Sequence, residues 1–420
     1  MLSIDYIKEN KNKVLETFKN KGYPIVNLDK LLLLNDNLKK LSTEVQLLRQ
    51  DLNANSKKGI DEATKEANKK IREQIQDKEN EIKKYESNLN SILLEIPNIP
   101  NDDVPIGTDE TQNKVLRTQG VPTKFDFKPK DHLELGESLD IIDVKTASKV
   151  SGSRFGYLKN ESVILEFALI QFALSKLIKK GFIPIIPPVL INKEITQQLG
   201  YWQGGGHEDY YSVLENKTNN QGYYLVGTAE HSMVPMHKDE LLSNKLLPLR
   251  YVGFSTAFRR EAGSYGKDVR GIFRVHQFDK VEMVSYTSSD NDTKEHEFLL
   301  SIEEELFQEL GIPYQVLQIC TGDLGFPIAK KFDINAWIPS QNKYRELTSV
   351  STTTDFQARR LNIKYQDKTE KKYAHILNGT AFAIGRTIIA ILENFQQKDG
   401  SVKIPKILHK YTGFTEIKKP

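Results

Sequence analysis

Apolar residues in the N-terminal part of the chain recur every three or four positions, which is the heptad pattern of a coiled coil. After a short helix expected within residues 1–26, the first run comprises Leu31, Leu34, Leu38, Leu41, Val45, Leu48 and Leu52. A polar stretch at residues 53–63 interrupts it, and the second run comprises Ile75, Ile82, Tyr85, Leu89, Ile92 and Ile96, with Lys78 in a position that should be apolar. The pattern predicts an antiparallel hairpin of two helices, roughly 40 Å long at 1.5 Å per residue. A dimerisation coil or a spacer is the commoner use of such a segment and stays open.

The pattern changes at residues 96–113, which are rich in Pro, Asn and Asp and therefore mark a domain boundary. We expect a helical domain at residues 1–110 and a larger domain at residues 111–420. In the larger one, residues 163–180 have helical periodicity and stop at Gly181, a usual helix end. The next segment, FIPIIPPVLI, contains three prolines, which exclude a central strand and favour a sheet edge or an interface.

Strand patterns dominate the rest of the chain. A long antiparallel hairpin is expected from residues 251–259 and 272–283, with Gly263, Gly266 and Gly271 in its loop. A charged helix is predicted at residues 293–310, and further strands near residues 314–319, 331–338 and 344–352 and up to Leu377. We expect a turn at Asn378-Gly379 and then a helix from about Thr380 to Gln396. Because the strands join mainly through hairpins, the predicted fold class is α+β, with helices flanking an antiparallel sheet.

Composition narrows the class of protein further. The 420 residues can bury a substantial core, and the formal net charge of +3 is too small to indicate a nucleic-acid partner by itself. The single cysteine, Cys320, excludes an internal disulfide framework and a cysteine-rich zinc site, and it fits a reducing compartment. Residues 163–178 are too short and too polar to span a bilayer, and the first residues do not resemble a signal sequence. We therefore expect a cytoplasmic protein without a membrane segment.

The predicted hairpin carries an unusual number of charges. They are Arg259, Glu261, Arg270, Arg274 and Glu282. Burying such groups is unfavourable unless each has a partner. That partner could be a ligand with phosphate and amine groups, or the charges could pair with one another on a surface ribbon, and the pattern leaves both open. Neither a GxxxxGK[ST] loop nor a strand-linked GxGxxG is present, but Arg259 and Arg386 could clamp a polyphosphate from two sides.

Six segments, taken in order, resemble the seryl-tRNA synthetases, a family of class II aminoacyl-tRNA synthetases. They are the helical arm, the linker IPNIPNDDVPIG, GFIPIIPPVLI as motif 1, TAE at residues 228–230, the hairpin as motif 2 and NGTAFAIGR as motif 3. The resemblance implies ligation of L-serine to tRNA(Ser) with ATP through a seryl-adenylate, and serylation of tRNA(Sec) where that tRNA exists. A non-ligating RNA-binding or scaffold paralogue is the main alternative. A paralogue that loads a carrier protein is a third, which the intact arm argues against.

The resemblance also implies an ATP site. Arg259 would hold the α-phosphate and the substrate carboxylate, and Arg386 would take the γ-phosphate end. Glu261 would accept from the adenine amino group, while Phe278 would stack on the ring. Glu346 and Ser349 would coordinate Mg²⁺ as hard oxygen ligands. The residues implied for ATP are Arg259, Arg260, Glu261, Arg274, Val275, Phe278, Glu346, Leu347, Thr348, Ser349 and Arg386, with Arg259 and Arg386 as catalytic residues.

For serine, the family pattern points to Thr228, Ala229, Glu230, Glu282 and Thr380. Glu230 suits the substrate ammonium and Glu282 its hydroxyl, and a buried carboxylate left without that hydroxyl would reject alanine. The residues alone allow plainer interpretations, which stay open. Thr228 can be a helix cap, Glu230 a first-turn residue and Thr380 an N-cap.

The chain departs from the usual family pattern in a few places. Arg260 and Thr380 stand where serine is usual, and ELTS at residues 346–349 stands where EVSS is usual. Threonine keeps the hydroxyl, and Arg260 is expected on the face of its strand opposite to Arg259. The segment YWQGGGHEDYY, which contains Gly204 to Gly206, also differs and leaves the gating of serine open.

Four histidines and the cysteine have plainer roles. His276 is expected to be a hydrogen-bonded structural residue and Cys320 a buried apolar one. His207, His231 and His237 have no cysteine partners, which argues against the zinc-dependent variant of the family.

The resemblance finally implies partners. Members of the family are homodimers that bind tRNA across the two subunits, and the arm holds the long variable arm of tRNA(Ser) by RNA shape and backbone. Lysines near the tip of the arm fit phosphate contacts: Lys57, Lys58, Lys65, Lys69 and Lys70. Lys267 and Arg270 are expected in the hairpin loop where the acceptor end would arrive.

Overall fold

The computed structural model describes residues 1–57, 62–213, 222–262 and 270–419. Contacts group these residues into two compact units, Met1–Lys19 with Tyr23–Pro97, and Asn20–Gly22 with Asn98–Pro420. Four residues named in the sequence analysis lie outside the described ranges: Lys58, Gly263, Gly266 and Lys267. The side chain of Lys57 also lies outside the description. Within these ranges no helix is both long and apolar enough to cross a membrane.

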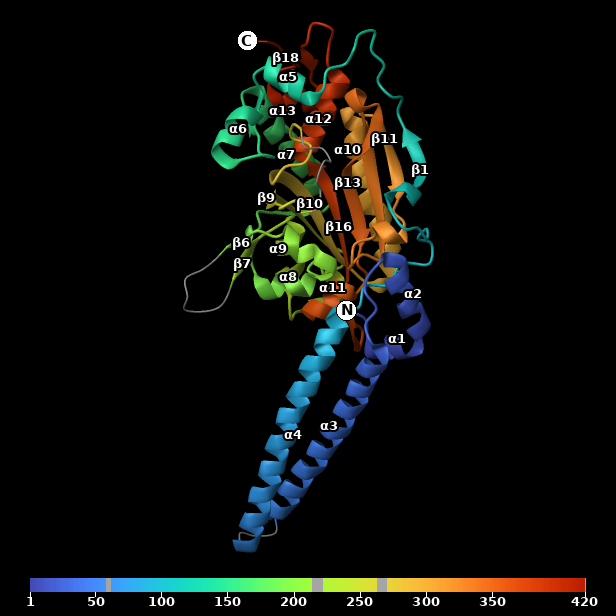
Figure 1. The fold of residues 1–420 in the computed structure, drawn as a ribbon, viewed down its shortest axis with the longest axis vertical. Helices are drawn as coiled ribbons and strands as arrows, with labels where there is room; N and C mark the ends of the chain where they lie inside the picture. The colour runs from blue at the N-terminus through green and yellow to red at the C-terminus, as the bar shows by residue number, and fades with distance from the viewer. Residues whose placement is uncertain (58–61, 214–221, 263–269, 420) are drawn as a thin grey trace. The chain divides into compact units, whose positions relative to one another are not determined.

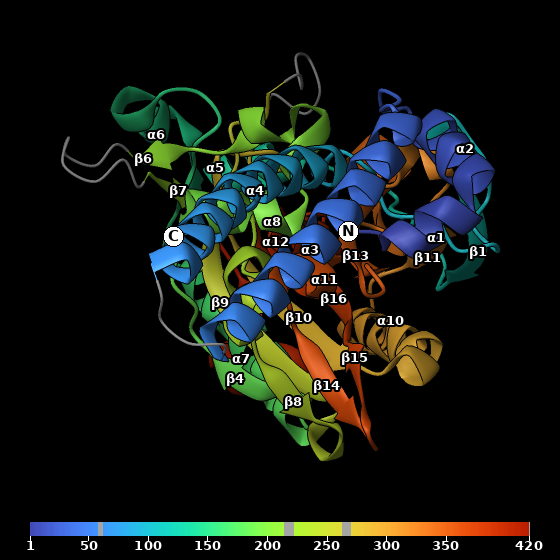
Figure 2. The same cartoon turned by 90° about the horizontal axis from the view of Figure 1, so that it is seen from below.

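The first unit is helical. Its elements are α1 (Ile4–Glu9), most of α2 (Lys11–Lys21), α3 (Leu28–Lys57) and α4 (Glu62–Leu94). The single short helix expected near the N-terminus is two helices, because the backbone leaves helical geometry at Asn10, with φ −120° and ψ 34°. α3 and α4 lie side by side (Figure 2). The polar interruption between them is shorter than predicted, since α3 continues as far as Lys57.

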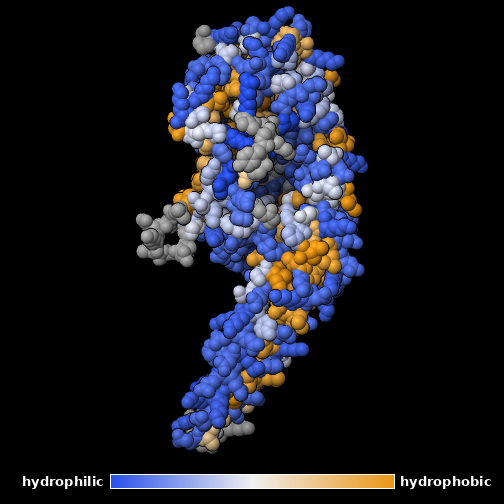
Figure 3. Space-filling view, in the orientation of Figure 1, coloured by the Kyte–Doolittle hydropathy of each residue, from blue (hydrophilic) through white to orange (hydrophobic). Residues whose placement is uncertain are grey.

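The predicted heptad seam joins α3 to α4. Leu31 and Val45 are buried and the other five seam residues of α3 are half-buried, whereas Leu47 on another face of α3 is 55% exposed. The polar seam residue Lys78 has its Nζ 2.5 Å from Glu44 Oε2 on the facing helix. The coiled-coil hairpin is therefore confirmed, and the surface of α3 and α4 seen in Figure 3 is largely hydrophilic.

The second unit is organised around a large, mainly antiparallel sheet (Figure 1). In the described residues its strand order is β1 (Lys114–Gln119), β11 (Tyr314–Gln318), β12 (Lys330–Ile338), β13 (Lys343–Thr352), β16 (His375–Ala383), β10 (Gln277–Thr287), β9 (Leu249–Phe258) and β4 (Ile183–Ile185). Neighbours are antiparallel except β4, which runs parallel to β9. The predicted antiparallel sheet is confirmed, and β4, which contains Pro184, lies at its edge as the prolines predicted.

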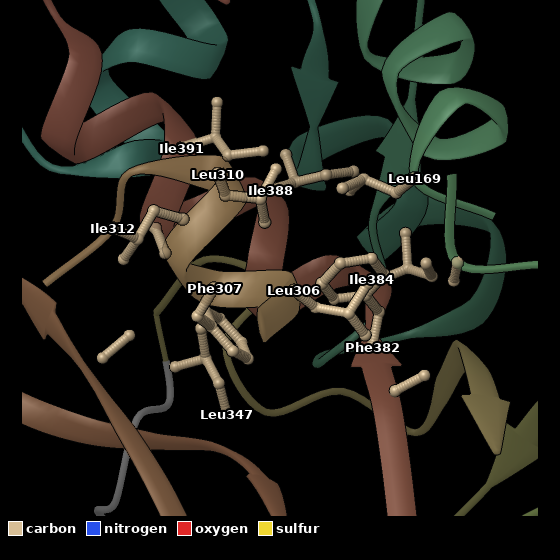
Figure 4. Close-up of a cluster of buried hydrophobic side chains, with 14 of the residues drawn as sticks. Leu169, Leu306, Phe307, Leu310, Ile312, Leu347, Phe382, Ile384, Ile388 and Ile391 are labelled. Carbon is tan, nitrogen blue, oxygen red and sulfur yellow. The ribbon is translucent and has the colours of Figure 1, made fainter. Parts of the chain in front are cut away.

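Three helices cover one face of this sheet and enclose the main hydrophobic core: α7 (Glu161–Lys179), α10 (Asp292–Leu310) and α12 (Ile384–Phe395). Figure 4 shows part of this core, where Phe307 and Leu310 of α10 lie near Ile388 of α12 and Leu347 of β13. α7 ends as predicted, with Gly181 just beyond it at φ 88°, a left-handed conformation that favours glycine.

The remaining elements are short and surround the sheet. The helices are α5 (His132–Ser138), α6 (Val144–Ser151), α8 (Lys193–Leu199), α9 (Glu230–Met233), α11 (Phe356–Leu361) and α13 (His409–Thr412). The strands are β2 (Ile142–Asp143), β3 (Tyr157–Leu158), β5 (Leu190–Asn192), β6 (Ser212–Val213), β7 (Tyr223–Leu225), β8 (Leu241–Ser243), β14 (Lys364–Asp367), β15 (Glu370–Tyr373), β17 (Val402–Lys403) and β18 (Glu416–Ile417).

The charged hairpin is formed by β9 and β10, which pair from Phe258 opposite Gln277 to Leu249 opposite Tyr286. The second arm was predicted to start at Ile272, but the strand starts later, at Gln277. His276 lies just before it, and its Nδ1 is 3.0 Å from the carbonyl oxygen of Arg259. This contact supports the structural role expected for that histidine.

The predicted turn at Asn378-Gly379 is wrong. β16 runs straight through both residues to Ala383, and α12 begins only at Ile384, so Thr380 is a strand residue and not an N-cap. The glycine serves close packing inside the sheet. A Cβ at Gly379 would lie 2.9 Å from Glu303 Oε1 and 3.2 Å from Met283 Cε, which leaves no room for a side chain.

Candidate active site

Two adjoining cavities open above the strands of the main sheet. Their volumes are about 210 Å³ and 390 Å³. They share part of their lining, including Arg259, Lys280, Glu346, Ser349 and Thr380. A ligand could therefore extend from one cavity into the other.

Alternate side chains of β10 face the two cavities. Phe278, Lys280 and Glu282 occupy every second position, so their side chains share one face of the sheet. Phe278 lines the first cavity, Glu282 the second, and Lys280 both. The opposite face of β10 carries Val281 and Met283 into the main core. A single strand thus lines both cavities with one face and packs against the hydrophobic core with the other.

The first cavity is rich in cations. Arg259, immediately after β9, has its guanidinium carbon 5.4 Å from the ring centre of Phe278, and its Nε donates to the carbonyl of Gly227. Arg274 forms a 2.7 Å ion pair with Glu261. Arg386 enters from the first turn of α12, where its guanidinium carbon lies 5.0 Å from the ring centre of Phe273. This arrangement suits a polyphosphate attached to a flat ring.

Glu346 is one of three acidic residues that line this cavity, with Asp209 and Glu261. It lies in β13, and its carboxylate is 3.4 Å from Arg386 Nη1 and 3.7 Å from Lys331 Nζ. The charges of Lys331, Arg386 and Arg259 together keep the pKa of Glu346 well below its usual range. The carboxylate is therefore ionised at neutral pH, and its side chain is still 46% exposed, so it remains accessible to a ligand.

The second cavity is lined by buried carboxyl groups. Glu230, in the first turn of α9, is 5% exposed and accepts a 2.6 Å hydrogen bond from the Tyr201 hydroxyl. Burial, reinforced by the nearby charge of Glu282, raises the pKa of Glu230 to about 7. A cationic ligand group beside it would favour the carboxylate form.

Glu282 lines the second cavity and is 1% exposed. Its Oε2 is 2.6 Å from Lys280 Nζ and accepts from the Thr380 hydroxyl at 3.2 Å. Lys280 also donates to Thr380 Oγ1 at 3.4 Å. Glu282, Lys280 and Thr380 form one hydrogen-bonded cluster, which fixes the carboxylate in place.

Most residues predicted for the site line these cavities: Thr228, Glu230, Arg259, Glu261, Arg274, Val275, Phe278, Glu282, Glu346, Leu347, Thr348, Ser349, Thr380 and Arg386. Two do not. Ala229 is fully buried in a smaller hydrophobic cluster. Arg260 is exposed, and its backbone N–H donates to the carbonyl of Asp209. The N-cap residue of α9 is Ala229, so the capping interpretation of Thr228 is wrong, although Thr228 Oγ1 accepts from the Glu230 N–H at 3.3 Å.

Several lining residues were missed by the sequence analysis: Lys280, Tyr201, Lys331 and Asn378. Lys280 had a signal, because it lies midway between Phe278 and Glu282 on an alternating strand. Tyr201 and Lys331 had none, because each reaches the cavity from a part of the chain distant from the hairpin. Asn378 was hidden by its assignment to a turn.

In the ranges described, no group of three or more His, Cys, Asp or Glu side chains could hold a metal ion. Burial lowers the pKa of His231 to about 3, so its ring is neutral, and its Nδ1 accepts from the Gly227 N–H at 3.2 Å. Cys320 is buried as expected. Together, the two cavities offer cations that can bind phosphate, carboxyl groups that can bind an amine or a hydroxyl, and a flat aromatic surface.

Comparison with known proteins gives the same picture over the whole chain. The family described as seryl-tRNA synthetase N-terminal domain matches residues 1–100, and the tRNA synthetase class II core domain (G, H, P, S and T) matches residues 211–395. A serine–tRNA ligase of Borrelia garinii subsp. bavariensis is 44% identical, with 99% of each chain covered. One from Pyrococcus horikoshii is 43% identical, covering 99% of this chain and 97% of the relative.

Solved structures agree with these relatives. The crystal structure of seryl-tRNA synthetase from P. horikoshii complexed with ATP superposes with a TM-score of 0.89 at 42% identity, covering all of both chains. The cytoplasmic serine–tRNA ligase from Naegleria fowleri in complex with AMP gives 0.88 at 33% identity, covering 100% of this chain and 99% of that one. The chain therefore belongs to the seryl-tRNA synthetase family of class II aminoacyl-tRNA synthetases.

Proposed function

We propose that this serine–tRNA ligase activates L-serine with ATP in the two joined cavities and then transfers serine to tRNA(Ser). The observation that carries the proposal is the contrast between the cavities, arginines in the first and buried carboxyl groups in the second, with Arg259 in the lining of both. That contrast matches a triphosphate and an amino acid that meet at the α-phosphorus. The ATP and AMP bound by the two related structures support the same use of the first cavity.

ATP occupies the first cavity in this proposal. Phe278 stacks on adenine, Glu261 accepts from its amino group, and Arg274 holds Glu261 in place through their ion pair. Arg259 binds the α-phosphate and Arg386 the γ-phosphate end, as bidentate guanidinium groups do. Val275, Leu347 and Thr348 contribute to the walls of this cavity. Arg260, which lies outside both cavities, has no role in ATP binding that its position supports.

Serine occupies the second cavity. Glu230 pairs with its ammonium, while Glu282 and Thr380 bind its hydroxyl in the buried cluster with Lys280. Thr228 lines the same cavity, and Ala229 packs behind it. Alanine would leave the Glu282 carboxylate without a hydrogen-bond donor from the substrate, which gives strong discrimination.

A magnesium site fits the residues present. Glu346 and Ser349 line both cavities and offer a carboxylate and a hydroxyl, the hard oxygen donors that Mg²⁺ prefers. These two residues would hold the ion, and phosphate oxygens and water would complete its coordination. When bound, Mg²⁺ would neutralise charge on the phosphates.

The chemistry needs positioning more than an acid or a base. A carboxylate oxygen of serine attacks the α-phosphorus, the bond to the bridging oxygen of pyrophosphate breaks, and Arg259 stabilises the charge that develops on the α-phosphate. The terminal ribose hydroxyl of the tRNA then attacks the seryl carbonyl, and AMP leaves. The arginines provide this stabilisation because they stay charged.

A homodimer is the proposed assembly. Phe167 on α7 is 55% exposed and Ile186, just beyond the edge strand β4, is 87% exposed, so apolar side chains gather where the prolines predicted an interface. A second copy of the chain would bury them. In that dimer tRNA would bind across the two subunits.

The division of labour is also a proposal, with residues 1–110 binding tRNA and residues 111–420 catalysing both steps. Lys65, Lys69 and Lys70 are exposed on α4, where they can contact RNA phosphates. Serylation of tRNA(Sec), where that tRNA exists, would use the same arm. The cytoplasmic location expected from the composition stays a prediction.

Serine-dependent exchange of pyrophosphate into ATP tests the function. The purified protein with Mg²⁺ should exchange with serine and not with alanine or threonine, and it should then charge tRNA(Ser) transcripts. A non-ligating paralogue would show neither activity. Parallel charging reactions with tRNA(Sec) transcripts address the second acceptor.

A further inference from the structure

Lys331 lies in the second cavity and has no part in the proposed reaction. Its Nζ is 2.9 Å from Asp333 Oδ1 and 3.7 Å from Glu346 Oε1. Its side chain is 21% exposed, so the ammonium is largely shielded from water. Its ammonium therefore lies between two carboxylates, those of Asp333 and Glu346.

The register of the sheet explains why this lysine reaches the proposed metal site. Lys331 and Asp333 are two residues apart in β12, and their partners in β13 are Ser351 and Ser349. Lys331 therefore shares a face with Ser349, one of the two proposed metal ligands, and makes an ion pair with the other, Glu346. The adjacent Lys330 projects to the opposite face, where it pairs with Asp103.

Glu346 is thus held between two cations, Lys331 on one side and Arg386 on the other. A divalent ion bound by Glu346 and Ser349 would lie within a few ångströms of this ammonium. The repulsion would oppose a bare metal ion, whereas a metal ion that carries a triphosphate would bring enough negative charge to offset it.

We propose that Lys331 serves as the counter-cation of the magnesium site while ATP is absent. It pairs with Glu346 and Asp333, and its charge disfavours binding of a divalent metal ion without ATP. The inference rests on the proposed function for the location of that site. Its consequence is ordered loading, in which metal binds with ATP and not before it. Lys331 acts through Glu346, whose carboxylate it positions, and does not itself contact the reacting atoms.

Binding of Mn²⁺ to the full-length protein without ATP, followed by the electron paramagnetic resonance signal of free Mn²⁺, tests the proposal. Lys331→Met should bind Mn²⁺ at least about fivefold more tightly than the wild type, because the nearest like charge is removed. Lys331→Arg keeps the charge and should stay within about twofold of the wild type. Lys330→Met is the matched control on the other face of β12 and should also leave Mn²⁺ affinity unchanged.

Lys331→Met leaves Asp333 buried without its partner and could impair folding. Lys331→Met combined with Asp333→Asn removes both charges, and it should bind Mn²⁺ more tightly than Asp333→Asn alone. Equal or weaker Mn²⁺ binding once Lys331 is removed, in either background, overturns the proposal.

Glu346→Gln separates this proposal from the magnesium site itself. It should weaken Mn²⁺ binding in the presence of ATP, and an unchanged affinity would mean that the metal binds elsewhere and that the site was misassigned. If Glu346→Gln weakens binding but Lys331→Met does not strengthen it, the site stands and only the counter-cation role fails.

Discussion

The helical arm and the catalytic site are specified in different ways. α3 and α4 meet along one seam whose residues are three or four apart in sequence, so each contact follows from the local pattern. The two cavities instead gather residues from Tyr201 to Arg386, brought together by the order of strands in the main sheet. The difference suggests two functions that can be removed separately, with RNA binding in the arm and amino acid activation in the sheet.

Deleting residues 31–95 gives the strongest test of this separation. tRNA(Ser) charging should fall by about a thousandfold or more, because most phosphate contacts would be lost. Serine-dependent pyrophosphate exchange should stay within about twofold of the full-length value, because every residue that lines the two cavities lies outside the deletion. Both activities would be measured on the same preparation. Equal loss of both would show that the arm and the site are not separable.

Glu282→Gln should produce the next largest effect, confined to the sheet. The amide keeps the shape but weakens the hydrogen bond to the serine hydroxyl and the pair with Lys280, so kcat/KM for serine in pyrophosphate exchange should fall by about 10²- to 10³-fold. The affinity for ATP should change far less. The preference for serine over alanine should shrink.

Glu295→Gln is a matched control for that substitution. Glu295 is also buried, but it pairs with Arg250 at 2.6 Å and lines neither cavity. Its change should affect stability while leaving the preference for serine intact. If Glu282→Gln keeps the full preference for serine over alanine, Glu282 does not read the hydroxyl.

The arm and the site also differ in how much of each could be predicted from the sequence. The seam residues of α3 were predictable because burial repeats with the helix period. The hairpin and the charges on it followed from alternation, and Lys280 could have been found by the same rule. The family resemblance, rather than periodicity, supplied the roles expected for Glu230 and Glu346.

Other features could not be read from local patterns. Asn378-Gly379 has the composition of a turn, yet it lies in mid-sheet, where Glu303 and Met283 approach position 379 too closely for any side chain. The contact of Tyr201 with Glu230 depends on how distant segments meet. Tertiary packing overrides turn propensity in the first case and is the sole source of the contact in the second.

The raised pKa of Glu230 predicts a pH dependence of serine binding that the arm does not share. Burial and Glu282 raise this pKa to about 7 in the free protein, and the neutral acid cannot pair with the serine ammonium. The dissociation constant for serine should therefore rise as the pH falls, approaching about tenfold per unit below the pKa. Calorimetric titration with serine from pH 5.5 to 8 measures it.

Glu230→Gln should bind serine more weakly and should flatten this profile over the same range, since no carboxyl group at this position remains to titrate. tRNA binding by the arm should show no matching transition. A profile that persists in Glu230→Gln would assign the titration to another group.

Lys78→Ile should have the smallest effect, a slight stabilisation confined to α3 and α4 of the arm. Lys78 occupies a seam position and is 31% exposed, with its charge paired to Glu44. Such a pair contributes up to about 1 kcal/mol, whereas an isoleucine in a partly buried seam position contributes slightly more. Amide exchange in α3 and α4 should therefore slow by about two- to fivefold, while pyrophosphate exchange stays unchanged.

Lys70→Ile is the control for that change, because Lys70 lies on an exposed face of α4 and its replacement should not slow amide exchange. The seam lysine has a second expected role, since one polar residue among apolar neighbours fixes the register of two helices. If exchange in Lys78→Ile becomes faster or heterogeneous, the loss of register outweighs the gain in burial. The polar residue would then be the feature that makes the arm a single defined structure.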